Sequence, residues 1–389
     1  MLRSRWTMLA LLFWIRAAMG FQFQSVASIA TPLAHGLGIS AASLGALIGL
    51  YILPGLFTAL PGGALASRLP DRLTATVGLI VMAAGSVVMA LAPSYAALAA
   101  GRLLAGTGYA FFTLVVTKMV AEWFAGREML TAMGVMLASW PCGIALGLAV
   151  QPALAVALGW PAAQWSVVAL CLIDAALTAL LYRAPERPRE TRVATRLWPS
   201  RRETALTLLA CLAWGALNVG LIIFFSFTPR LLEARGYATT EAAALVSIGL
   251  WVSTFAVPLS GMIAERVARP LLAAAALSVV AALALLLLDR AGTPALYSAL
   301  LGLAIGMPVT VTIALPTRLL RPQSLATGLG LFYAFYFVQM MLGPMLAGWV
   351  ADQVGRAEGA IWTGAAAFVL GAVITGFFPF LTERRELRG

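Results

Sequence analysis

The chain has 389 residues, of which 61% are hydrophobic and 11% are charged, and its formal net charge is +11. Soluble globular domains carry about 25% charged residues, so this composition excludes a water-soluble fold and indicates an integral membrane protein. Its basic residues are spread over many short segments, which favours contact with anionic lipid and argues against nucleic-acid binding.

Twelve apolar segments are long enough to cross a bilayer. They are continuously apolar and lack period-two alternation, so they predict helices and exclude a strand barrel. Six lie on each side of a polar segment, which predicts an N-terminal six-helix bundle at 1–182, a cytoplasmic linker at 183–203 and a C-terminal six-helix bundle at 204–389. The predicted spans are 6–31, 40–66, 73–92, 95–124, 129–157, 161–182, 204–232, 241–264, 270–288, 293–317, 325–349 and 358–381.

The distribution of arginine predicts the orientation of these spans. With both termini cytoplasmic, nineteen arginines fall on the inner side and only four (Arg230, Arg235, Arg290 and Arg356) in the outer loops. This is the bias of the positive-inside rule. We therefore expect both termini in the cytoplasm.

Two stretches of the chain resemble each other. Thr31-Pro32 recurs as Thr228-Pro229. When the two stretches are then offset by one further residue, Gly38, Leu47, Gly63, Ala66 and Arg68 recur as Gly236, Leu245, Gly261, Ala264 and Arg266. A membrane chain built from two such halves is typical of transporters, because a site between the halves can open to either side.

Several short motifs follow in order along the spans. They are Gly63 to Arg72 after the second span, Arg102-Leu-Leu-Ala-Gly-Thr-Gly108 in the fourth, Trp140-Pro141-Cys-Gly143 in the fifth, Gly261 to Arg269 after the eighth, and Gly343-Pro344 to Gly348 in the eleventh. Together they resemble the loop, helix-4 and Gly-Pro motifs of the major facilitator superfamily, and the whole chain resembles its bacterial anion porters of the cyanate and nitrate type.

This resemblance implies an all-α membrane protein whose two six-helix bundles are related by a pseudo-two-fold axis along the membrane normal. It also implies rocker-switch alternating access in a bacterial inner membrane, with helices 1, 4, 7 and 10 lining the cavity. The residues it assigns to gating or conformational change are Gly63, Arg68, Pro141, Gly261, Glu265, Arg266 and Pro344. The first loop departs from the family pattern at Ser67, whereas Glu265 keeps the acid in the second loop. For the glycines, helix packing is the alternative interpretation.

Two arginines lie deep in the spans of the first half, where ionisable residues are costly and often functional. Helical phase places Arg16 and Gln24 on one face, and Arg102 on one face with Tyr109 and Thr113. A guanidinium is permanently charged and its planar fork suits oxyanions. We expect these faces to bind an anion. An internal structural pair or snorkelling remains open for Arg16, and a structural or gating role for Arg102.

The second half has no deep charge in its predicted cavity helices. Its candidate substrate-binding residues supply hydrogen bonds and aromatic surface, with helix packing as the alternative. They are Trp214, Asn218, Thr312, Tyr333, Tyr336 and Gln339.

Asp174 is the only acid deep in a predicted span. A carboxyl in such surroundings can carry a co-transported proton, and an internally paired structural aspartate is the alternative. A single histidine and three separated cysteines predict no metal site and no cofactor. We find no cluster of His, Asp and Glu that predicts an enzyme.

We therefore expect a monomeric secondary transporter for a small organic or inorganic anion. A proton-coupled drug or metabolite efflux antiporter is the alternative, since Pro141 and Pro344 resemble the helix-5 motif of such exporters. A membrane sensor that uses a transporter fold is the remote alternative.

Overall fold

The computed structural model describes residues 4–58, 70–124, 128–185, 198–288, 292–321 and 323–383. Every regular element in these ranges is a helix. The first half holds α1 (Arg5–Gln24), η1 (Ala27–Ile29), α2 (Ala30–Leu37), α3 (Ala41–Leu50), α4 (Leu53–Thr58), α6 (Asp71–Ala90), α7 (Tyr95–Trp123), α8 (Met129–Leu158) and α9 (Trp160–Leu181). The second half holds α10 (Arg201–Ala234), α11 (Thr239–Ala264), α12 (Pro270–Leu287), α13 (Pro294–Ala304), α14 (Gly306–Ile313), α15 (Leu315–Leu319), α16 (Leu325–Val354) and α17 (Glu358–Glu383).

Eleven helical stretches in the described residues are long and apolar enough to cross a membrane. The remaining predicted span, 40–66, begins as α3 and α4 and then leaves the described residues. The predicted all-α fold with twelve spans in two bundles is confirmed. Residues 186–197 of the predicted linker lie outside the described ranges, so its boundaries stay a prediction.

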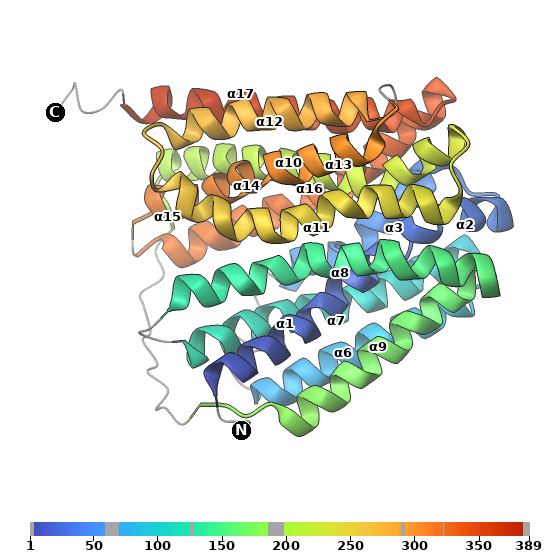
Figure 1. Ribbon diagram of the computed structural model, residues 1–389. Coiled ribbons are helices and arrows are strands. Elements are labelled where there is room, and N and C mark those ends of the chain that lie inside the picture. Colours follow the sequence, from blue (N-terminus) through green and yellow to red (C-terminus); the bar gives the residue numbers. More distant parts are fainter. Residues whose placement is uncertain are drawn as a thin grey trace.

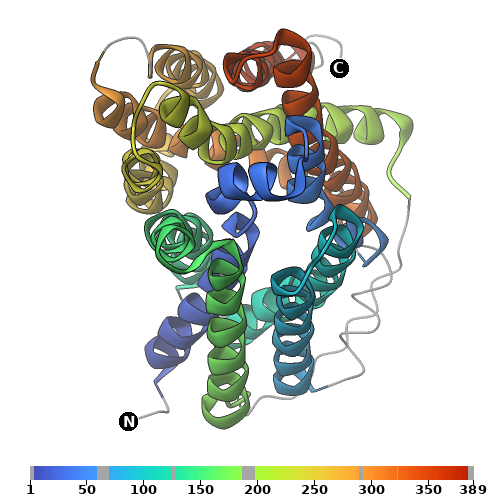
Figure 2. The ribbon, with the colours of Figure 1, turned by 90° about the vertical axis from the view of Figure 1, so that its right-hand side faces the viewer.

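The two halves lie against each other along their length (Figure 1). Helices α1, α6, α7, α8 and α9 form one side, α10 to α17 form the other, and α8 packs along α11 between them. The helix α1 begins and α17 ends at the same end of the molecule, which we call the terminal end. The opposite end, the far end, holds α2 and α3, which lie between the two halves in Figure 2.

Three predicted spans are broken rather than continuous, and 40–66 already divides into α3 and α4 in its described part. The predicted span 293–317 is divided into α13, α14 and α15, and Pro308 and Pro316 lie at the starts of the two later pieces. Proline lacks the N–H that continues a helix and clashes with the carbonyl four residues earlier, which accounts for both breaks.

The break in the first span has a different cause. The helix α1 ends at Gln24 without proline, and Arg102 of α7 takes the carbonyls that would continue it. Arg102 donates from Nη1 to Gln22 O at 2.9 Å and from Nη2 to Phe23 O at 2.6 Å. Its Nε donates to Leu47 O near the end of α3 at 3.0 Å. A buried cation is therefore stabilised by the carbonyl ends of two helices, where the helix dipole is negative.

The far end of the interface is closed by close backbone packing between α3 and α16. A side chain at Gly45 would collide with Pro344 O, and one at Gly348 would collide with Ala41 O. Across the same contact, the N–H groups of Ala41 and Ala42 each donate to one carboxylate oxygen of Asp352 at 2.9 Å. Asp352 thus caps the N-terminus of a helix in the other half.

We predict that Asp352→Ala weakens closure of the far end. Losing a helix cap costs about 1 kcal/mol, so the far end should open about fivefold more often. The measurement is the rate at which a water-soluble, membrane-impermeant maleimide modifies Ala30→Cys, a buried position in α2, in a background whose native cysteines are replaced by alanine. Gln353→Ala, at the exposed neighbouring position, is the control. Equal labelling rates in Asp352→Ala and the control would contradict the prediction.

We also predict that Arg102→Ala lowers the stability of the fold by about 3 kcal/mol or more, because three carbonyls lose a charged donor. Arg102→Lys should be intermediate, since an ammonium cannot reproduce the planar fork. The measurement is the thermal unfolding midpoint in detergent. Arg5→Ala, which breaks an exposed ion pair to Glu128, is the matched control and should change stability by less than about 1 kcal/mol. Equal midpoints for Arg102→Ala and the control would refute the capping role.

Candidate functional site

Arg16 lies midway along α1 and is 9% exposed. Its Nη1 donates to Met136 O at 2.6 Å and to Ser139 Oγ at 2.8 Å, both on α8. These are its only hydrogen bonds to described residues, and its Nε is buried without an acceptor among them. No described carboxylate pairs with it. Its Nη2 donates no hydrogen bond to a described residue, so this nitrogen of a permanently charged group remains unpaired.

One tyrosine from each half lies near this arginine. Tyr109 of α7 and Tyr333 of α16 lie close enough to the guanidinium to interact with it electrostatically. The ring of Tyr109 also packs against Trp140 of α8 at 5.7 Å between centroids. Tyr333 is 37% exposed, so its ring is accessible at the interface between the halves.

The second half contributes a compact aromatic cluster centred on Trp214 of α10. Its ring lies 4.1 Å from that of Tyr336, 5.4 Å from that of Phe332 and 6.2 Å from that of Tyr333. Trp214 is 7% exposed, and its Nε1–H has no acceptor among the described residues. We call Arg16, Tyr109, Trp140, Trp214, Tyr333 and Tyr336 together the Arg16 cluster.

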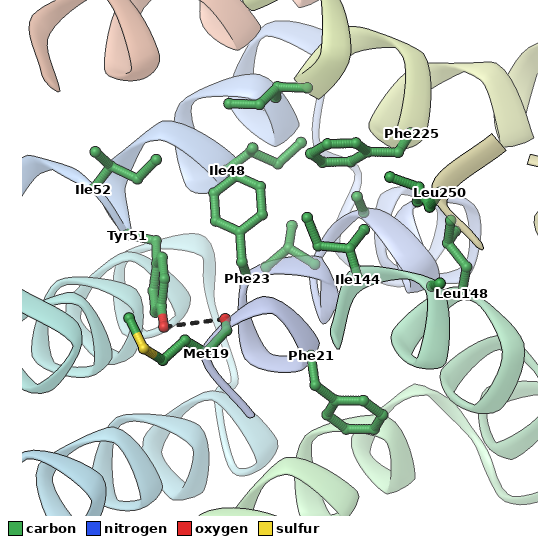
Figure 3. Packing of buried hydrophobic residues seen from close by; sticks show 14 of the residues in the cluster. Met19, Phe21, Phe23, Ile48, Tyr51, Ile52, Ile144, Leu148, Phe225 and Leu250 are labelled. Atoms are coloured by element: carbon green, nitrogen blue, oxygen red, sulfur yellow. Dashed lines mark hydrogen bonds between the residues drawn. The ribbon is translucent and has the colours of Figure 1, made fainter. Parts of the chain in front are cut away.

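On the far-end side of the Arg16 cluster, the interface is apolar. Figure 3 shows Phe23, Phe225, Leu250 and Leu148 packed together there, with contributions from both halves. The rings of Phe23 and Phe225 cross the interface at 5.9 Å. Phe23 lies seven residues after Arg16, about 10 Å farther along the helix, so the cluster is closed on this side.

A second tyrosine completes this apolar layer. Tyr51 is fully buried, and its hydroxyl lies 3.4 Å from Met19 O, the bond drawn in Figure 3, and 3.2 Å from Gln22 Oε1. Its ring packs on Tyr109 at 4.8 Å and lies under the Arg102 guanidinium at 4.7 Å. The layer is thus linked both to the Arg16 cluster and to the arginine that breaks the first span.

The structure does not bring Arg102 to the Arg16 cluster. It is fully buried and holds three backbone carbonyls, in agreement with the structural alternative that the sequence left open. Substrate contact by Arg102 would require these bonds to break. Helical phase placed it correctly on the face of Tyr109, but that face is covered by α1 and α3.

Other predicted binding residues are engaged in helix packing. Gln24 donates to Phe225 O of the other half at 3.2 Å, and Gln339 donates to Cys211 O at 3.2 Å. Thr312 is buried and donates to Pro308 O of its own helix at 2.7 Å, and Asn218 donates to Trp214 O at 2.8 Å. The hydroxyl of Thr113 is buried without a partner among the described residues. Among the predicted residues, Arg16, Tyr109, Trp214, Tyr333 and Tyr336 therefore gather most closely.

Asp174 lies apart from the Arg16 cluster, on α9. It is fully buried, and neither carboxylate oxygen has a hydrogen-bond partner of good geometry among the described residues. The indole of Trp14 on α1 is the polar group that acts on it. Asp174 has no ion-pair partner among the described residues but has Trp14 beside it, so the proton carrier and the internally paired structural aspartate both stay predictions.

The predicted gating residues are only partly described. Gly63 and Arg68 lie outside the described residues. Glu265 and Arg266 are exposed just after α11 and form no ion pair with a described residue, and Gly261 lies in ordinary contact distance of Thr310. These assignments stay predictions.

Two proline positions lie beside close contacts between helices. Pro344 belongs to the α3–α16 contact described above, and Pro141 lies where α1 and α8 touch, with Gly20 against Trp140 O and Gly143 against Ala17 O. Their role in conformational change stays a prediction.

Several residues of the interface were not predicted. Gln22 and Tyr51 are polar residues inside apolar spans, and this polarity could have identified them from the sequence. Asp352 and Glu233 lie in loop-proximal segments, and their partners, Ala41 and Thr31, are distant in sequence. The described residues contain no group of three or more His, Cys, Asp or Glu that could hold a metal.

Comparison with known proteins identifies the family. The model of the Major Facilitator Superfamily matches residues 12–298. The chain is 27% identical to a chloramphenicol resistance protein of Streptomyces lividans over 94% of each chain, and 27% identical to the transcription regulatory protein OpdE of Pseudomonas aeruginosa over 92% of this chain and 89% of that one. It is 23% identical to the hexuronate transporter of Bacillus subtilis over 63% of this chain and 61% of that one, so this match spans less than two thirds of that transporter.

Solved structures agree with the fold. A bacterial homolog of the human lysosomal transporter Spinster, in an inward-facing and occupied conformation, superposes with a TM-score of 0.79 at 18% identity, covering 99% of this chain and 98% of that one. Because the family model matches well over half of the residues, the chain belongs to the Major Facilitator Superfamily and is a membrane transporter.

Proposed function

We propose that this protein is a secondary active transporter that moves a small organic or inorganic anion across the bacterial inner membrane, acting as a monomer with both termini cytoplasmic. The observation that carries the proposal is the environment of Arg16. A charge held inside a membrane protein without a counter-ion is costly. An anionic substrate supplies that counter-ion, and the unpaired Nη2 of Arg16 offers it a charged donor.

The arrangement of the halves supports rocker-switch transport. The side-chain hydrogen bonds between the halves in the described residues join Gln24 to Phe225, Thr31 to Glu233, and Ala41 and Ala42 to Asp352. All of them lie on the far-end side of Arg16. With cytoplasmic termini, this is a conformation closed to the outside, from which substrate leaves at the terminal end.

Efflux of a lipophilic compound is the alternative that a specific observation favours. The stacked rings of Trp214, Phe332 and Tyr336 would suit an uncharged aromatic drug, and one relative is a chloramphenicol resistance protein. Another relative is named a hexuronate transporter, which favours an anion. A third is named a transcription regulatory protein, in keeping with a sensor as the remote alternative.

Asp174 is the candidate carrier of a co-transported proton in this proposal. A carboxylate in a fully buried position, with the indole of Trp14 as its polar neighbour, bears a large cost of desolvation, and binding a proton removes that cost. Asp174 lies on α9 beside Trp14 of α1. Because α1 also carries Arg16, protonation of Asp174 is connected to the anion site through α1.

We predict that Arg16→Gln reduces anion uptake at least tenfold, because a charged hydrogen bond contributes about 1.5–3 kcal/mol. Arg16→Lys should retain part of the activity. The assay is uptake of radiolabelled glucuronate, benzoate, nitrate and chloramphenicol into proteoliposomes, and Arg5→Gln, on the exposed start of α1, is the control. Chloramphenicol transport that is unaffected by Arg16→Gln would favour efflux, and undiminished anion uptake would refute the proposal.

For Asp174→Asn, we predict that uptake no longer responds to an imposed pH gradient, while exchange of substrate across the membrane continues, because the amide cannot release a proton. The measurement compares gradient-driven uptake with substrate exchange in proteoliposomes. Glu241→Gln, at an exposed position at the start of α11, should respond like the wild type. A gradient response that survives in Asp174→Asn removes this residue as the proton carrier.

A further inference from the structure

We infer that Ser139 is a positioning residue of the anion site, which fixes the Arg16 guanidinium so that its unpaired Nη2 is presented to the anion. This inference rests on the proposed anion transport and names a further residue on which the same site depends. Ser139 is fully buried on α8, and its hydroxyl accepts a hydrogen bond from Arg16 Nη1 at 2.8 Å. Because it is fully buried, it acts on the anion through Arg16 rather than by contact.

The hydroxyl of Ser139 has a single proton, and a neighbouring carbonyl already takes it. Ser139 Oγ donates to Met136 O at 2.6 Å, so the bond from Arg16 Nη1 falls on a lone pair of the same oxygen. Nη1 also donates to Met136 O at 2.6 Å. The serine hydroxyl, the carbonyl and Nη1 thus form a closed triangle of three hydrogen bonds, and the hydroxyl cannot turn without breaking one of them.

Nη1 is the part of the guanidinium through which its orientation is fixed. Arg16 Nε is buried without an acceptor among the described residues. Nη2 donates no hydrogen bond to a described residue and, unlike Nε, is not fully buried. A single acceptor on Nη1 would leave the planar group free to turn about that bond. The two acceptors, Met136 O and Ser139 Oγ, together fix its plane and therefore the direction of Nη2.

The backbones that carry these side chains are held in close contact. On α1, a side chain at Gly20 would collide with Trp140 O, and on α8 one at Gly143 would collide with Ala17 O. Small residues at such places allow two helices to pack backbone against backbone. Because the helices are held together beside Arg16, the direction of its guanidinium depends on the side-chain acceptor that α8 offers.

Other serines inside helices of this protein make the local bond without an arginine. Ser166, Ser247 and Ser253 each donate to the carbonyl three residues earlier, at 2.6, 2.7 and 2.9 Å. Within the described residues, none of these three hydroxyls accepts a hydrogen bond from a charged side chain. Local helix geometry therefore explains the bond from Ser139 to Met136 O, but not the bond that Ser139 receives from Arg16.

The test measures the concentration dependence of uptake of radiolabelled glucuronate, benzoate and nitrate into proteoliposomes that contain the full chain. We expect Ser139→Ala to raise KM for the transported anion about threefold to tenfold and to change the maximal rate by less than about twofold, because a misdirected Nη2 weakens binding. Ser278→Ala is the matched control and should leave KM unchanged. It removes a fully buried hydroxyl on α12 that donates to Ala274 O of its own helix at 2.8 Å.

Two further substitutions separate the acceptor from the volume of the side chain. Ser139→Cys keeps the shape but offers a weak acceptor, so it should raise KM as Ser139→Ala does. Ser139→Thr keeps the hydroxyl and should stay within about twofold of the wild-type KM. In an Arg16→Gln background, Ser139→Ala should change the KM of the residual uptake by less than about twofold, because the group that it positions is gone.

The outcomes separate this inference from the proposed function. If Arg16→Gln lowers anion uptake while Ser139→Ala and Ser139→Cys leave KM unchanged, the positioning role is overturned and anion transport stands. An equal rise in KM from Ser139→Ala with and without Arg16 also overturns the role, since the serine then acts independently of the arginine. If the wild-type protein takes up none of the three anions, the proposed function and the inference fall together. Ser139→Cys, which conserves volume, keeps the test decisive even if Ser139→Ala does not fold.

Discussion

The guanidinium of Arg102 organises the first half of the molecule. It is fully buried, and its charge is met by carbonyls near the ends of α1 and α3. The carbonyls of Gln22 and Phe23 lie at the end of α1, and the guanidinium binds both of them together with Leu47 O of α3. A buried charge with poor partners is strongly destabilising, whereas one that receives three well-placed acceptors fixes the relative positions of the elements that supply them. The helix α7 is thereby attached to the first two spans at the depth where the apolar layer around Phe23 begins.

The two halves share a scaffold and differ in chemistry. Each half has the long spans and the glycine-containing turns expected of a duplicated unit. The deep charges Arg16, Arg102 and Asp174 belong to the first half, and the second half supplies Trp214, Tyr333 and Tyr336 to the shared interface. In the proposed anion transport, the first half supplies the charge and the second half supplies aromatic surface. A substrate that needs both would couple its occupancy to the approach of the two bundles.

The fold could be predicted from the sequence because bilayer thickness sets the length of each apolar segment. The arginine bias predicts the orientation of the spans, and the repeated motifs predict the relation between the two halves. The site was accessible only in part. Helical phase put Arg16 and Arg102 on polar faces, but it carries no information about which neighbour covers a face. One arginine meets aromatic rings at the interface, and the other meets the carbonyls of α1 and α3. Similarly, no local pattern joins Asp352 to Ala41, because that contact depends on how the halves dock. Pro308 and Pro316 were visible signals for the division of the tenth span, whereas the break after Gln24 required knowledge of a residue on another helix.

The bonds from Arg16 to Met136 O and Ser139 Oγ have a mechanical consequence. They attach the residue to α8, and α8 is the helix that runs alongside α11 of the other half. In the proposed transport, a ligand bound to this guanidinium therefore acts on the helix that contacts the other half. Because the same side chain would touch both the ligand and this helix, the effect of binding would reach the interface between the halves without passing through a chain of intermediate residues.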